Sequence, residues 1–259
     1  MWKLFTAVIP AVVLIAYILY RDKYERETLK PVFISFFAGM LAVPIDLLLI
    51  DLLNLEILPF YFSGALPEVA DAFVLAAIPE ELSKLVILFI VIWKNKNFNE
   101  RMDGIVYAVC VSMGFATIEN VMYVFEDPSC ALGRAIFAVP GHFLFAVLMG
   151  FFLSMVKFTV KHRFRNIVLT LLAPVLAHGI YDSILMVSDV LSPFWQSALM
   201  IMFYVFIFLL WRICLRRIKE HVESSPFAYW RRFNQEDRSN IDDIYEDNRI
   251  DNMKDFFDR

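Results

Sequence analysis

The chain has 259 residues, of which 59% are hydrophobic, and its mean hydropathy is +0.61. A soluble domain of this length would be nearer half apolar, so the composition excludes an ordinary soluble protein. The formal net charge of −4 gives no basic footprint for nucleic acid. The three cysteines have no paired spacing, so we expect neither a disulfide framework nor a thiolate metal site.

Apolar stretches of about 20 residues recur along the chain, and each can cross about 30 Å of hydrocarbon as a helix. The sequence therefore predicts an all-α fold, a polytopic membrane helix bundle of about seven transmembrane helices. The first apolar run lacks a small-residue cleavage pattern, so we expect a retained helix rather than a signal peptide. The expected spans are residues 2–20, 31–54, 69–93, 104–125, 131–157, 167–188 and 194–214.

Lysine and arginine alternate strictly between the two sides of this arrangement. The connections after spans one, three, five and seven are rich in them, those after spans two and six have none, and that after span four has only Arg134. The positive-inside rule then places the N-terminus outside and the C-terminus in the cytoplasm of a bacterial plasma membrane. We expect residues 1–215 to form the bundle that carries the site. Residues 216–259 should form a cytoplasmic juxtamembrane segment and an acidic tail.

Ionisable residues lie inside the apolar spans at four places. A charge in hydrocarbon costs a few kcal/mol or more, so several of them together indicate a functional site. Carboxylates and imidazoles without a thiol suit a hard or borderline metal ion or an activated water. The four groups are Glu80, Glu81 and Lys84; Glu119; His142; and His178 with Asp182.

The depth of these residues in the membrane predicts that they meet. Counted from the outer end of each span at 1.5 Å per residue, they fall within roughly 8 Å of one another, in the outer half of the bilayer. Two of the four helices that carry them run inward and two run outward. Ionisable residues buried at random would not be expected to share one depth. We therefore expect one site that opens toward the extracytoplasmic side.

Spacing within each helix adds detail. His178 and Asp182 are four residues apart, so they can ligate one ion together, or Asp182 can orient the imidazole. Glu80 and Glu81 are four and three residues from Lys84, which predicts an internal ion pair. Two acids against one lysine should leave one carboxylate free for general acid and base chemistry.

The remaining polar residues have weaker signals. Asn120 can supply an amide hydrogen bond to a substrate or to Glu119. His142 is either structural or a ligand, and the preceding Pro140-Gly141 predicts a local opening of the helix. Asp46 is expected to pack near the site, and Asp51 to lie nearer the outer surface.

The motifs in this order resemble the PrsW family of bacterial intramembrane peptidases, distant relatives of the CAAX prenyl-protease and bacteriocin-processing group. The resemblance implies a site-1 cut in a membrane-spanning anti-sigma factor on its extracytoplasmic side. At the positions of Glu119 and Asp182 the prenyl-protease relatives have histidine and asparagine, so their mechanism does not transfer. The motifs are Glu80-Glu81-Leu82-Ser83-Lys84, Phe115-Ala116-Thr117-Ile118-Glu119-Asn120, His142 and His178-Gly179-Ile180-Tyr181-Asp182.

We therefore predict an intramembrane endopeptidase that holds a divalent ion, Zn²⁺, and whose partners are a single-span membrane protein and lipid. Glu80 or Glu81 would be the general base, and Lys84 would orient the pair. In a metal-independent alternative, Glu80 and Glu119 activate water and His178 stabilises the oxyanion. The expected ligands are His142, His178, Asp182 and Glu119.

Two other functions are compatible with these residues. A divalent-metal transporter also uses intramembrane histidines and carboxylates, but its path should continue toward the cytoplasm, where spans three to six have almost no acids. A non-enzymatic membrane scaffold or immunity-type protein would keep the site without its activity. Purified protein and a single-span substrate would separate the three.

Overall fold

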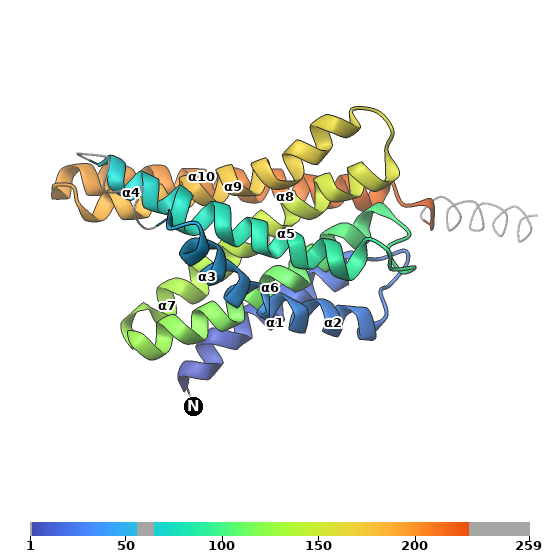
Figure 1. Cartoon of the computed structure of the whole chain (residues 1–259), viewed down its shortest axis with the longest axis horizontal. Coiled ribbons are helices and arrows are strands. Elements are labelled where there is room, and N and C mark those ends of the chain that lie inside the picture. The colour runs from blue at the N-terminus through green and yellow to red at the C-terminus, as the bar shows by residue number, and fades with distance from the viewer. Residues whose placement is uncertain (1, 56–64, 228–259) are drawn as a thin grey trace, which may run out of the picture.

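The computed structural model describes residues 2–55 and 65–227, and within these ranges the regular structure is entirely helical (Figure 1). This confirms the predicted all-α membrane bundle. The helices in chain order are α1 Trp2–Arg21, α2 Leu29–Met40, α3 Ala42–Leu52, α4 Leu66–Ala70, η2 Asp71–Ala77, α5 Ile78–Ile92, α6 Arg101–Glu126, η3 Pro128–Cys130, α7 Ala131–Gly133, η4 Arg134–Ala138, α8 Val139–Phe158, α9 Arg163–Asp189 and α10 Pro193–Glu223.

Six helical stretches of the described residues are long and apolar enough to cross a membrane, and the chain is a multi-pass membrane protein. The predicted span that is not among these six is the third, residues 69–93, which corresponds to the continuous run of α4, η2 and α5; its ionisable residues make this run less apolar. The second span is broken at Leu41, between α2 and α3. Pro44 explains the break, because it has no N–H to donate to the carbonyl of Met40.

Helix α6 lies at the centre of the bundle and packs against α8, α2 and α1. Most of its side chains are buried, including those of the small residues Ala108, Ser112 and Ala116. A Cβ on Gly104 would overlap the hydroxyl of Ser154, and a Cβ on Gly150 would overlap the carbonyl of Gly104. The backbones of α6 and α8 therefore touch at the two glycines.

Two π-helical turns, η2 and η4, come directly before α5 and α8. Each ends two residues before a proline, Pro79 or Pro140, whose missing N–H removes an α-helical hydrogen bond. The expected opening at Pro140-Gly141 is therefore wrong, because the chain stays helical through both residues. The irregularity is the π-helical turn before them, a feature that is frequent at functional sites.

At its C-terminal end α10 continues to Glu223, past the boundary predicted at residue 215. Ser225 follows, and its hydroxyl donates a hydrogen bond to a carboxylate oxygen of Glu100 at the start of α6. Most of the predicted acidic tail lies outside the described residues. The division into a bundle and a tail stays a prediction.

Candidate active site

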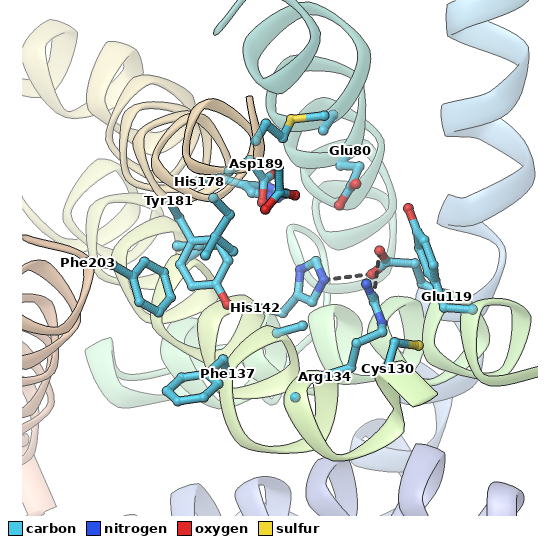
Figure 2. A pocket seen from close by; sticks show the side chains of 18 of the residues that line it. Glu80, Glu119, Cys130, Arg134, Phe137, His142, His178, Tyr181, Asp189 and Phe203 are labelled. Carbon is cyan, nitrogen blue, oxygen red and sulfur yellow. Dashed lines mark hydrogen bonds and ion pairs between the residues drawn. The ribbon is translucent and has the colours of Figure 1, made fainter. Parts of the chain in front are cut away.

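A pocket of about 620 Å³ opens between α5, the end of α6, η4, α8, α9 and α10. Figure 2 shows Glu80, Glu119 and His142 pointing toward one another inside it, with aromatic rings such as Phe137 and Phe203 on the far wall. The pocket wall is mostly apolar. Its polar groups are concentrated on one side. The pocket lining includes five of the predicted residues: Glu80, Glu119, His142, His178 and Asp182.

Lys84 is the buried centre of the network on α5. Its Nζ lies 3.0 Å from Oε2 of Glu80 and 2.8 Å from Oε1 of Glu81. It also lies 3.1 Å from Nδ1 of His142 and above the ring of Phe115. The expectation that one of the two acids stays free of Lys84 is therefore wrong. An ammonium has three donors, and residues three and four positions before it are both within its reach.

Glu119 is held between an imidazole and a guanidinium. Its Oε2 lies 2.7 Å from Nε2 of His142, and its Oε1 lies 2.8 Å from Nη2 of Arg134 (Figure 2). Arg134 Nε donates to Oδ1 of Asn120 at 2.7 Å and the guanidinium stacks over the ring of Tyr123. Asn120 is fully buried and does not line the pocket, so the structure gives it a role in holding Arg134.

His178 lies between two carboxylates on opposite sides of its ring. Nδ1 is 3.0 Å from Oε1 of Glu81, and Nε2 is 3.0 Å from Oδ2 of Asp182. The ring stacks on Phe145 and lies 5.5 Å from the ring of His142, between centroids. The four ionisable groups predicted to meet are therefore in one continuous network.

The donor atoms fit a divalent metal ion. Ligand atoms of Glu80, Glu119 and His142 lie within 4.8 Å of one another, and so do those of Glu80, Glu81 and His178. Carboxylate oxygens and imidazole nitrogens beside an open pocket are ligands that a catalytic divalent ion can use. Glu80 belongs to both groups, whereas Asp182 belongs to neither. One contact would have to change on binding, because the Lys84 ammonium faces a nitrogen of His142.

One residue of the site, Arg134, was not predicted to belong to it. Arg134 is the one lysine or arginine between Arg101 and Lys157, which is a usable signal in an apolar region. Asp46, predicted to pack near the site, is buried, and its Oδ1 has no hydrogen-bond partner among the described residues. It interacts electrostatically with Lys84 and Glu119.

Comparison with known proteins decides the family. The sequence matches the PrsW family intramembrane metalloproteases over residues 27–211, which include every residue of the network. The chain belongs to the PrsW family. The expected resemblance is confirmed, and the chain is a protease that acts on a membrane protein within the bilayer.

Named relatives cover most of the chain. It is 32% identical over 231 residues to Protease PrsW of Clostridioides difficile, which covers 86% of this chain and 93% of that protein. It is 34% identical over 222 residues to Protease PrsW of Geobacillus kaustophilus, with 85% and 92% coverage. It is 35% identical over 181 residues to Protease PrsW of Bacillus subtilis, with 68% and 79% coverage. No solved structure matches the chain significantly.

Proposed function

We propose that this intramembrane protease makes the first, site-1, cut in a membrane-spanning anti-sigma factor, on its extracytoplasmic side. The observation that carries the proposal is the pocket on whose wall Glu80, Glu119 and His142 gather. The alternating basic loops support an N-terminus outside, and this orientation turns the pocket toward the extracytoplasmic half of a bacterial plasma membrane.

The proposed metal is zinc, and its proposed ligands are His142, Glu119, His178 and Asp182. Ligand atoms of His142 and Glu119 already lie within 4.8 Å of each other, whereas His178 and Asp182 contact each other at 3.0 Å and would have to turn toward the ion. When bound, zinc would polarise the scissile carbonyl and make hydroxide available near neutral pH. Neighbouring side chains hold the proposed ligands in place. Arg134 fixes Glu119 at 2.8 Å, and Glu81 fixes His178 at 3.0 Å.

Glu80 is the proposed general base because it belongs to both donor groups and lines the pocket. Its carboxylate takes a proton from a water, the water oxygen forms a bond to the peptide carbonyl carbon, and the C–N bond breaks. The proton then passes from Glu80 to the leaving nitrogen. Lys84, 3.0 Å away, holds the carboxylate in place while it changes charge.

The pocket wall has the character needed for an apolar substrate segment. Phe137, Tyr181 and Phe203 face the carboxylates across the pocket (Figure 2). A peptide bond within a helix is sterically protected, so the substrate has to present an unwound strand. Aromatic rings beside the acids can pack against its side chains while the polar side meets the exposed backbone.

The experiment that tests this function is cleavage of a single-span substrate by the purified protein in nanodiscs. Mass spectrometry of the fragments should place the cut at the extracytoplasmic end of the substrate span. Glu80→Gln should lack the activity, and Asp51→Asn, an exposed acid at the end of α3, should keep it. A cut at the cytoplasmic end, or equal cleavage by Glu80→Gln, would contradict the proposal.

A further inference from the structure

A second group of carboxylates lies at the other end of α6. From Asp103 to Glu119 along this helix is about 24 Å at 1.5 Å per residue, so the two groups are separate. In the proposed orientation this second group faces the cytoplasm. We call it the inner acid cluster, and its members are Asp22, Glu25, Glu27, Glu100 and Asp103.

The cluster joins segments that are far apart in the sequence. Ligand oxygens of Glu25, Glu100 and Asp103 all lie within 4.8 Å of one another. Glu25 comes from the connection between α1 and α2, and the other two come from the first turn of α6. Ser225, just after α10, also contacts Glu100. Three parts of the bundle therefore meet at these carboxylates.

Several of their oxygens have no donor although they are buried. Asp103 has an exposed fraction of 0%, and no N–H or hydroxyl donor of the described residues reaches its Oδ1, while its carboxyl group lies within hydrogen-bonding distance of the Glu27 carboxyl group. Oε2 of Glu25 and Oε1 of Glu27 are also buried without a partner. A buried carboxylate oxygen without a partner is costly, so these atoms point to a missing positive charge.

No basic side chain supplies that charge in the described ranges. None of the five acids has a lysine or arginine nitrogen within 4.0 Å there. Lys157 is near enough to interact with Asp103, but its Nζ donates to the carbonyl of Phe98 at 2.6 Å and lies above that ring. Among the described residues, therefore, no lysine or arginine forms an ion pair with these carboxylates, and Lys157 acts on Asp103 only at longer range.

Helix capping explains only part of the arrangement. Glu100 is the N-cap of α6, and Oδ2 of Asp103 accepts hydrogen bonds from the N–H groups of Asn99 and Glu100 at 2.8 and 2.7 Å. This satisfies one oxygen of Asp103 and leaves the other. The helix dipole favours an acid here, but three further acids raise the cost, and burial and like charges raise the pKa of Glu100.

We propose that Glu25, Glu100 and Asp103 bind a hard divalent cation, Mg²⁺ or Ca²⁺, at a site separate from the catalytic pocket. The donors are all carboxylate oxygens, which such ions prefer, and water molecules complete the coordination. The ion neutralises the cluster and ties the connection after α1 to the start of α6. It serves the stability of this end of the bundle and takes no part in peptide hydrolysis.

The test is the thermal unfolding of the full-length protein in nanodiscs, in EDTA and then in increasing free Mg²⁺ or Ca²⁺. We expect a saturable rise in the unfolding temperature, with half-saturation on the order of 0.1–1 mM for such a site. The ion with the lower half-saturation is the preferred one. A flat response to both ions at 10 mM would overturn the proposal.

Variants separate specific binding from general screening. Glu25→Gln keeps an acceptor for Asn99 Nδ2 and removes one charge, so it should unfold at a higher temperature than wild type in EDTA and need at least tenfold more cation. Asp103→Asn should show the same loss of cation response. Glu223→Gln changes an exposed acid paired with Lys219 and should respond as wild type does.

A third variant separates this site from the catalytic one. His142→Ala removes a predicted catalytic ligand and leaves the inner acid cluster intact, so its response to Mg²⁺ and Ca²⁺ should equal that of wild type. If the cation response is lost in His142→Ala and kept in Glu25→Gln, the ion binds at the catalytic pocket and the proposal is wrong. This readout is independent of proteolysis, so it stands or falls separately from the proposed function.

Discussion

Oε1 of Glu81 lies 3.0 Å from Nδ1 of His178 and 2.8 Å from Nζ of Lys84, so one buried oxygen joins α5 to α9. Glu80, the neighbouring residue, lines the pocket, whereas Glu81 does not. Two adjacent acids of the same type thus have different surroundings, and their variants should fail in different ways.

Glu80→Gln should lower the rate of cleavage roughly 100-fold or more, because an amide cannot accept the proton of the attacking water. Its unfolding temperature should stay near that of wild type. Glu81→Gln should lower both activity and unfolding temperature, since it weakens the contacts with Lys84 and His178. The measurements are fragment formation and thermal unfolding in the same nanodiscs. Full activity in both variants would remove the pair from catalysis.

Arg134→Gln should lower cleavage at least tenfold, because it removes the ion pair that holds Glu119. Arg134→Lys should recover only part of the activity, since an ammonium cannot contact Glu119 and Asn120 with the fixed geometry of a guanidinium. Arg165→Gln, an exposed arginine at the start of α9, is the matched control and should behave as wild type. Equal rates for Arg134→Gln and wild type would show that Glu119 needs no such support.

The purified protein should carry about one divalent ion per chain at the catalytic site, and a strong chelator should stop cleavage. His178→Ala should lower both metal content and activity. Asp182→Asn should reduce metal content as much if Asp182 is a ligand, and less if it only orients His178. Elemental analysis after removal of Mg²⁺ and Ca²⁺ is the measurement. Full activity in metal-free protein would favour the glutamate mechanism without metal.

Reporter fusions should give a cytoplasmic signal at Asn97 and His162 and an extracytoplasmic signal at Ser129. The reason is the distribution of lysine and arginine between the loops. The inner acid cluster provides a second landmark, because Asn97 lies next to it and Ser129 lies at the pocket end of α6. A reversed pattern would place the pocket on the cytoplasmic side and contradict the proposed cut.

Thermal stability in EDTA should fall as pH rises from about 4 to about 7, because of Asp22. Burial and the nearby charge of Glu100 raise the pKa of Asp22 to about 7 from a usual value of 3.8. Between these values the folded chain holds a proton that the unfolded chain has lost, so a higher pH favours unfolding. Asp22→Asn should reduce this pH dependence, while Glu223→Gln should leave it unchanged. An identical slope in Asp22→Asn would show that other groups cause it.

The sequence predicted the membrane bundle and the meeting of the four ionisable groups because both follow from local geometry. Rise per residue fixed the common depth of Glu80, Glu119 and His142, and helical spacing fixed the contact between His178 and Asp182, at 3.0 Å. Spacing within one helix needs no knowledge of its neighbours.

Contacts between helices could not be predicted in the same way. The pairing of Arg134 with Glu119 depends on how η4 turns the chain ahead of α8, and a π-helical turn has no clear sequence signal. The double contact of Lys84 depends on side-chain rotamers inside a packed interior. The break at Leu41 had a signal in Pro44, but hydropathy alone obscured it.

The contact between Gly104 and Gly150 has a mechanical consequence. Neither helix can slide or turn on the other without driving a carbonyl into a neighbouring atom, so α6 and α8 act as one rigid block. Glu119 and His142 belong to this block, and their separation is set by it. The other sides of the pocket are bordered by η2, α5, α9 and α10, so we expect a substrate span to enter between these helices and not between α6 and α8.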